Sequence, residues 1–216
     1  MQVLRAQMNP HFIFNSLTSI NKFVLKNETD AASNYLTKFS RLIRMVLTNS
    51  KKPMISLADE LEMLRLYLEM EKLRFKEAFI YCFDMDETID AENIFIPPLL
   101  LQPFVENAIW HGLMHKEGQG RIDVGLRMEN GILVCTIRDN GVGRSYAKAS
   151  TSKSAQKQKS MGIDITRQRL ALIDGGMEDN TDNLYIEDLY LDGVPAGTQV
   201  TIKIRIAQGR TFNITT

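Results

Sequence analysis

Near its N-terminal end, the chain places a histidine and an asparagine four residues apart in the segment NPHFIFN, residues 9–15. Side chains at positions i and i+4 share one face of a helix, so His11 and Asn15 are expected side by side, with Phe12 and Phe14 packing inward. A neutral imidazole can attack phosphorus, and the amide could orient a water or a phosphoryl oxygen. The alternative is a histidine that only caps or packs its helix.

A second polar pair lies in the segment PFVENAIWHG, residues 103–112. The pattern predicts a helix over Leu99–His111 that carries Asn107 and His111 on one polar stripe, with Glu106 next to the asparagine. An amide oxygen suits Mg²⁺, which keeps most of its waters and takes few protein ligands. The alternative is a buried amide with its hydrogen bonds satisfied inside the helix.

Two glycine-containing segments follow. Asp139-Asn140-Gly141-Val142-Gly143 comes directly after a predicted strand; its glycines allow a ligand to approach the backbone, and the Asp139 carboxylate could accept a hydrogen bond from an exocyclic amine such as that of adenine. An ordinary turn is the alternative. Further on, Ser160 and Gly162 stand before a predicted helix, where free N–H groups and the helix dipole favour phosphate.

The segment before Ser160, Arg144–Lys159, has five basic residues, no acidic residue and almost no large apolar side chain. Such a stretch cannot bury a face, so it is interpreted as a mobile loop, and a long loop inside a compact domain is usually functional or a lid. A solvated surface loop is the alternative.

The periodicity of apolar residues predicts the elements that position these groups. A helical period is expected over 30–50, 56–75 and 163–173, and Ser56 should cap the second of these helices with Asp59 three residues on. A period of two predicts strands near 79–84, 122–128, 133–138, 184–191 and 200–206, with Asn130-Gly131 as a hairpin turn. We therefore expect an α+β fold in which a mostly antiparallel sheet is covered by helices.

Composition narrows the class of protein. The 216 residues carry no net charge, which argues against a general nucleic-acid binder. Two cysteines give no disulfide framework, and no apolar stretch is long enough to span a bilayer. The charge is divided, with net +4 over residues 1–77 and net −4 over residues 78–216, which fits two modules with those bounds.

Taken together, these segments resemble the GHKL ATP-binding superfamily and, within it, the LytS-like sensor histidine kinases. The resemblance is carried by NPHFIFNSL, ELEMLRLYLEMEKLRF, IPPLLLQPFVENAIWHGL and DNGVG, and it covers nearly the whole chain. It implies a helical hairpin for dimerisation and histidine phosphotransfer over residues 1–77, with a truncated first helix. It also implies an ATP-binding catalytic domain of the GHKL (Bergerat) type, an α/β sandwich with a mostly antiparallel sheet, over residues 78–216.

The resemblance implies a role for each candidate residue. His11 would accept the phosphoryl group with Asn15 one turn away, and Glu106 would orient the attacking group or a water. The nucleotide-binding residues would be Asn107, His111, Asp139, Gly141, Gly143, Ser160 and Gly162. Among these, Asn107 would also ligate Mg²⁺, and Asp139 would bind the adenine amine. Trp110 and Ser160 depart from the family pattern, which often has a basic residue and a glycine at these positions.

The function implied is the cytoplasmic core of a two-component sensor histidine kinase, part of a longer inner-membrane protein. It would use ATP and Mg²⁺ to phosphorylate its own histidine, work as a homodimer, and transfer the group to an aspartate of a response regulator, for which a LytTR-type regulator is one expectation. Contact with the membrane would come only through preceding segments, and no direct nucleic-acid binding is implied. Two alternatives stay open: a GHKL-type ATPase or protein-serine kinase, and a nonenzymatic, nucleotide-gated dimerisation module.

Overall fold

The computed structural model describes residues 10–144, 166–167, 170 and 183–206. By its internal contacts the chain forms two compact units. The first unit contains Met1–Ile80 together with Ala91–Gln102, and the second contains Tyr81–Asp90 together with Pro103–Thr216. The segment 91–102 therefore belongs with the helices, although it follows the predicted boundary in the sequence.

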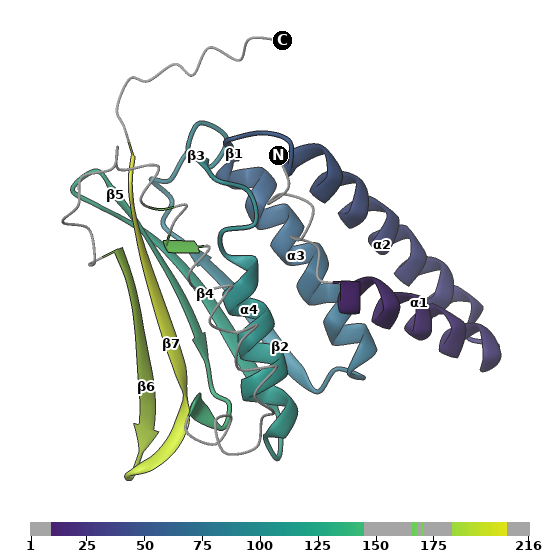
Figure 1. Cartoon of the computed structure of the whole chain (residues 1–216). Coiled ribbons are helices and arrows are strands. Elements are labelled where there is room, and N and C mark those ends of the chain that lie inside the picture. The colour runs from purple at the N-terminus through teal and green to yellow at the C-terminus, as the bar shows by residue number, and fades with distance from the viewer. Residues whose placement is uncertain (1–9, 145–165, 168–169, 171–182, 207–216) are drawn as a thin grey trace. The chain divides into compact units, whose positions relative to one another are not determined.

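The first unit is built from three helices and a short antiparallel ribbon (Figure 1). Its elements are α1 (Pro10–Leu25), α2 (Thr29–Asn49), β1 (Ile55–Ser56), α3 (Leu57–Arg74) and β3 (Phe95–Ile96). The helices predicted over 30–50 and 56–75 are confirmed as α2 and α3. The predicted cap is also present, because the Ser56 hydroxyl accepts a hydrogen bond from the Asp59 N–H at 3.1 Å.

Left-handed residues end two of these helices. After α1, the N–H of Asn27 donates to the Val24 carbonyl and that of Glu28 to the Phe23 carbonyl, which is the Schellman pattern. Asn27 has φ 57°, a conformation that asparagine tolerates. The same pattern follows α3, where Lys76 has φ 51° and Glu77 has φ 61°. The second turn therefore places two residues with a Cβ atom in a conformation that favours glycine.

Apolar side chains from all three helices form the core of the first unit. Among its fully buried members are Tyr35, Leu42, Leu57, Met63, Leu64, Tyr67, Leu68 and Met70. Two ion pairs join α2 to α3 at the edge of this core: Lys38 pairs with Glu69, and Arg41 pairs with Glu62 at 3.0 Å. The ion pairs thus lie at the edge of the contact between α2 and α3, while burial of the apolar residues provides most of its stability.

One acidic side chain lies inside the first unit. Glu60 of α3 is 1% exposed, and its two carboxylate oxygens accept hydrogen bonds from the backbone N–H groups of Leu99 at 2.7 Å and Leu101 at 2.9 Å. Leu99 has φ 57°. The carboxylate therefore fixes the backbone of the segment that runs into the next helix.

The second unit contains a five-stranded sheet in the order β2-β4-β5-β7-β6 (Figure 1). The strands of this sheet are β2 (Phe79–Met85), β4 (Gly120–Glu129), β5 (Ile132–Asp139), β6 (Leu184–Leu191) and β7 (Val194–Arg205), and the first two residues of β2 fall within the first unit. The pairs β4–β5, β5–β7 and β6–β7 are antiparallel. Asn130 and Gly131 join β4 to β5 with φ of 50° and 79°, as expected for a type I′ hairpin turn. The predicted α+β class, strands and hairpin are confirmed, although β7 begins at Val194 rather than near residue 200.

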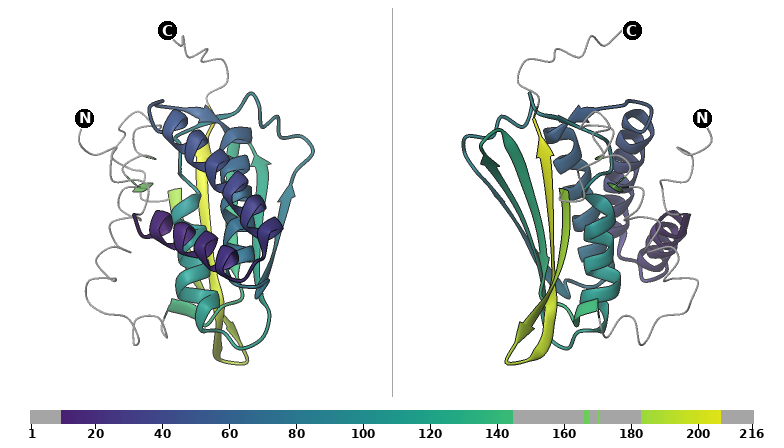
Figure 2. Two further views of the ribbon diagram at one scale, coloured as in Figure 1. Left: turned by 90° about the vertical axis from the view of Figure 1, so that its right-hand side faces the viewer. Right: turned by 60° about the vertical axis from the view of Figure 1, so that its left-hand side comes forward.

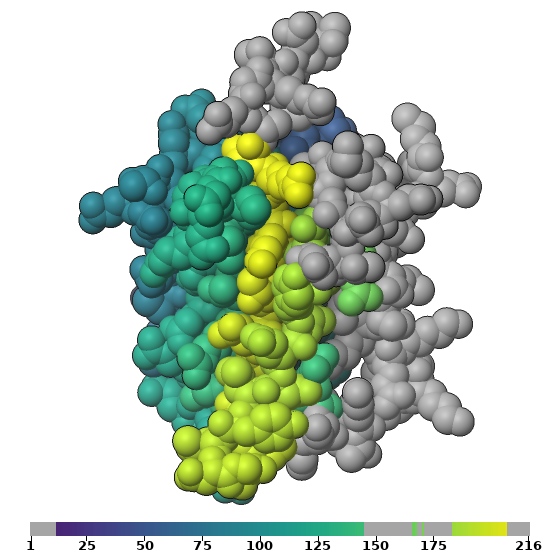
Figure 3. Space-filling model, turned by 90° about the vertical axis from the view of Figure 1, so that its left-hand side faces the viewer, coloured from purple at the N-terminus to yellow at the C-terminus, as the bar shows by residue number. Residues whose placement is uncertain are grey.

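The two faces of this sheet differ. One face carries buried apolar residues in cross-strand rows, such as Leu126, Cys135 and Ile202, and helix α4 (Gln102–Asn107) runs along it (Figure 2). The other face, seen in Figure 3, carries half-buried and exposed polar residues, and no helix from the described part of the second unit covers it. This is the pattern of an antiparallel sheet with one face on the core.

Candidate functional site

The segment with His11 lies in α1, where His11 and Asn15 stand one turn apart on a continuous α-helix. Phe12 is 6% exposed, with its ring centroid 5.2 Å from that of Tyr67, so it anchors the first turn of α1 in the core. The prediction that Phe14 also packs inward is wrong, because Phe14 is 69% exposed. Residues two apart in a helix point to different sides, so one phenylalanine could be buried only with the other outside.

The helix with Asn107 is shorter than predicted. Leu99, expected as its first residue, adopts a left-handed conformation, and α4 begins at Gln102. After Asn107 the chain changes to a π-helical turn, Ala108–Gly112, a feature that often marks functional sites. Glu106, Asn107 and His111 are half-buried. The amide therefore closes the α-helical segment, and His111 lies in the wider turn that follows it.

The turn with Asp139 follows β5 as predicted. Asp139 is 5% exposed, and its Oδ1 accepts a hydrogen bond from the Gly141 N–H at 2.8 Å. Asp139 pairs in register with Ile122 of β4 and Thr198 of β7, so its side chain projects to the covered face of the sheet. Gly143 has φ 75°, which favours glycine at that position.

The π-helical turn and the Asp139 turn lie directly against each other. The Val142 N–H donates to the Gly112 carbonyl at 3.2 Å. A Cβ atom on Gly141 would lie 2.4–2.7 Å from the backbone of Gly112, closer than any real contact. The second unit thus brings the end of the π-helical turn that follows Asn107 into backbone contact with the turn that follows Asp139.

A further residue closes the site from the opposite strand. Gly197 of β7 has φ 131°, and a Cβ atom there would lie 2.0 Å from the Asp139 carbonyl oxygen. Neither Gly112 nor Gly197 was singled out from the sequence, and neither was Thr198. Gly197 precedes the alternation over 200–206 that predicted this strand, and β7 begins at Val194, so the alternating pattern did not point to it.

Arg144 was predicted to begin a mobile loop, and the structure contradicts this for Arg144 itself. Its guanidinium donates to both carboxylate oxygens of Asp188 on β6, at 2.7 and 2.8 Å. The neighbouring carboxylate raises the pKa of Arg144 further, which keeps it charged. The bidentate pair ties the residue after the glycine turn to the edge of the sheet.

Several predicted positions lie outside the described residues. These are Ser160, Gly162 and the loop 145–159. The helix predicted over 163–173 is described only at Thr166, Arg167 and Leu170, which are helical.

No cluster of three or more His, Cys, Asp or Glu side chains in the described part of the chain could hold a metal ion. A divalent cation held mainly by phosphate oxygens needs only one or two protein oxygens. The Asn107 amide at the end of α4, with Glu106 beside it, fits this second kind of site. Also among the described residues, no helix combines the length and apolar character needed to cross a bilayer.

Comparison with known proteins identifies relatives of this chain. A sequence model of the histidine kinase family matches residues 1–79. Over 211 residues the chain is 30% identical to the Bacillus subtilis protein YwpD, covering 96% of this chain and 70% of YwpD. The chain belongs to the histidine kinase family.

Two named relatives refine this placement. The sensor protein LytS of Staphylococcus haemolyticus is 36% identical over 140 residues, 65% of this chain and 24% of LytS. The sensor histidine kinase BtsS of Escherichia coli is 35% identical over 173 residues, 79% of this chain and 28% of BtsS. The chain thus spans about a quarter of the length of these two relatives. A solved histidine kinase domain from Erythrobacter litoralis EL346 aligns with a TM-score of 0.49 at 16% identity, covering 79% of this chain and 76% of that domain.

Proposed function

We propose that this chain is the catalytic core of a two-component histidine kinase, which uses ATP to phosphorylate His11 and passes the phosphoryl group to an aspartate of a response regulator. The observation that carries the proposal is the direct contact, in the second unit, between Gly112 at the end of the π-helical turn that follows Asn107 and the turn that follows Asp139. Membership of the histidine kinase family supports it.

In this proposal the second unit binds the nucleotide. The buried Asp139 carboxylate accepts the adenine amino group, a charge-assisted bond that gains strength from a site with little water. Gly141 and Gly143 keep side chains away from the base. His111, Ser160 and Gly162 complete the proposed nucleotide site on the phosphate side.

Mg²⁺ would be held by the Asn107 amide oxygen, and it would neutralise charge on the phosphates that it binds. Glu106, next in the chain, would orient the attacking group or a water. Since Asn107 closes α4 and Gly112 ends the following turn, the backbone of the π-helical turn sets the spacing between Asn107 and Asp139.

The transfer step needs little covalent help from the protein. A ring nitrogen of His11 forms a bond to the γ-phosphorus while the bond from that phosphorus to the β,γ-bridging oxygen breaks, which leaves ADP and phosphohistidine. In the second step a carboxylate oxygen of the regulator's aspartate displaces the ring nitrogen. Positioning and charge stabilisation supply most of the rate enhancement.

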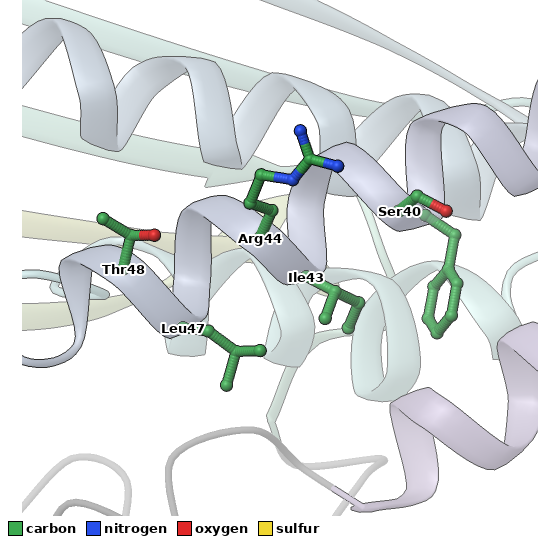
Figure 4. Close-up of a pocket in the computed structure, with 6 residues that line it drawn as sticks. Ser40, Ile43, Arg44, Leu47 and Thr48 are labelled. Atoms are coloured by element: carbon green, nitrogen blue, oxygen red, sulfur yellow. The ribbon is translucent and has the colours of Figure 1, made fainter.

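We propose that the first unit makes the homodimer. α1 exposes Phe14, Leu17, Val24 and Leu25, each more than half exposed, while its Ser16 and Ser19 are buried. On α2 a groove of about 420 Å³ is lined by Phe39, Ser40, Ile43, Arg44, Leu47 and Thr48, and Ile43 and Leu47 point the same way (Figure 4). Apolar stripes on two neighbouring helices fit a helical bundle between two chains.

Asn15 would act on the regulator. Its amide, one turn from His11, would orient a water for hydrolysis of the regulator's aspartyl phosphate. The Asn15→Ala protein should keep autophosphorylation and dephosphorylate the regulator more slowly; a dephosphorylation rate equal to that of the wild type would refute this role.

The test of the proposed function is incubation with Mg²⁺ and γ-labelled ATP, with His11→Ala and Asp139→Ala proteins alongside. We expect label on the wild-type chain that is labile in acid and stable in alkali, and no label on either variant. Light scattering after size exclusion measures the dimer.

Other results of this labelling experiment would support a different assignment or function. Label that persists on the His11→Ala chain would overturn the assignment of the phosphoacceptor. Steady ATP hydrolysis that the His11→Ala change leaves intact, with no labelled chain, would identify an ATPase. Nucleotide binding without hydrolysis or label would identify a dimerisation module.

A further inference from the structure

Gly112 stands where the backbone does not require a glycine. Its φ of −97° and ψ of −67° are helical, a region open to every residue type. Alanine is favoured over glycine in helical segments by about 1 kcal/mol. Local conformation therefore gives no reason for a glycine at the end of the π-helical turn.

The space beside Gly112 gives the reason. A Cβ atom built on it would lie 2.8 Å from Oδ1 of Asp139, and its next two neighbours, at 3.3 and 3.7 Å, are the Cγ and Oδ2 of the same carboxylate. The three nearest atoms are thus all in the Asp139 side chain, which occupies the room that a methyl group at 112 would take.

Gly112 differs in this from Gly141 and Gly197. A Cβ atom on Gly141 would meet the backbone of Gly112, and one on Gly197 would meet the Asp139 carbonyl oxygen at 2.0 Å. Substitution there would force two backbone segments apart. At Gly112 only the end of one side chain has to move, so the protein should still fold with alanine at this position.

We propose that Gly112 is a positioning residue for recognition of the nucleotide base: by lacking a side chain, it lets the Asp139 carboxylate take the position in which it accepts the exocyclic amine. Oδ1 accepts the Gly141 N–H at 2.8 Å, and it lies 2.8 Å from where a Cβ atom on Gly112 would be. A methyl group at 112 would push this oxygen away, and the angle of its hydrogen bond to the amine would change. The inference rests on the proposed binding of ATP by this unit.

The experiment compares ATP with inosine triphosphate, in which an oxygen replaces the exocyclic amine while sugar and phosphates stay the same. Affinities of the full chain for both nucleotides are measured with Mg²⁺ by titration calorimetry. The wild type should prefer ATP by tenfold or more, because a hydrogen bond to a buried carboxylate is lost with inosine. In Gly112→Ala this preference should fall at least fivefold, through weaker binding of ATP.

Gly125→Ala is the matched control. This glycine lies within β4, and a Cβ atom there would meet the Thr136 hydroxyl at 2.5 Å, so the change strains the sheet away from Asp139. Its preference for ATP over inosine triphosphate should equal that of the wild type. A preference that Gly112→Ala leaves unchanged, or equal weakening of both nucleotides, overturns the inference. A wild type that binds neither nucleotide instead overturns the proposed function.

A double-mutant cycle with Asp139→Ala keeps the inference testable if Gly112→Ala folds poorly. Asp139→Ala removes the atoms that the new methyl group would meet. In that background Gly112→Ala should not lower the midpoint of thermal unfolding. Equal losses of thermal stability from Gly112→Ala in both backgrounds would show that the glycine serves the backbone and overturn the inference.

Discussion

The buried carboxylate of Glu60 supports a quantitative prediction about the helical unit. Its two oxygens accept the N–H groups of Leu99 and Leu101, both at normal hydrogen-bond distances. In Glu60→Gln, one oxygen remains and an NH₂ group faces the other N–H, donor against donor. Hydrogen bonds to charged groups contribute about 1.5–3 kcal/mol each. Losing one and weakening the other should lower the free energy of unfolding by about 2–4 kcal/mol.

Glu62→Gln on the same helix is the control for this prediction. Glu62 pairs with Arg41 at 3.0 Å, and its side chain is 32% exposed. A pair this open to solvent contributes about 0.5 kcal/mol or less. Urea unfolding followed by far-ultraviolet circular dichroism gives both values. If Glu60→Gln changes stability no more than Glu62→Gln does, the carboxylate does not fix the segment before α4 and the reasoning is wrong.

Three further predictions concern Tyr35, Lys76 and the Arg144 pair. Burial raises the pKa of Tyr35 above its usual 10.0, so the stability that the neutral phenol contributes is present below pH 10 and is lost as the pH rises further. In Tyr35→Phe, the decline of the thermal unfolding midpoint at alkaline pH should therefore be shallower than in the wild type. An equally steep decline would contradict the assignment. Lys76→Gly relieves a φ of 51° and should stabilise the chain by about 0.5–1 kcal/mol in urea unfolding, whereas Lys72→Gly, inside α3, should destabilise it. A double-mutant cycle of unfolding free energies with Arg144→Gln and Asp188→Asn should give a coupling energy of about 1 kcal/mol. This energy should be smaller in high salt, because the ion pair is partly open to water. Additive effects of the two substitutions would show that the pair does not couple.

Most of the secondary structure could be predicted because it depends on local patterns. The helical period of α2 and α3 and the alternation along β4 and β5 are properties of neighbouring residues, and each was confirmed. The start of α4 was misplaced because the conformation of Leu99 is tied to Glu60, 39 residues earlier. Apolar periodicity cannot report a contact with so distant a partner.

The candidate site likewise has parts that follow from local sequence and parts that depend on contacts between distant residues. The Asp139 turn and the Asn107 helix were found because each is a short contiguous motif. Their meeting through Gly112 and Gly197 was not found, because it joins the end of a helix to two strands far apart in the sequence. The exposure of Phe14 could have been anticipated, since helical geometry places it away from Phe12.

The fit of Gly197 against Asp139 also limits how β5 and β7 can pair while the sheet forms. A slip of one residue would turn every side chain of β7 to the opposite face. A slip of two residues would keep the faces but bring Pro195 or Gln199 to the position where even a Cβ atom would lie 2.0 Å from the Asp139 carbonyl oxygen. The end of β5 that holds Asp139, the proposed nucleotide-binding residue, thus also selects the register, because β5 and β7 can pair along their full length in only one alignment.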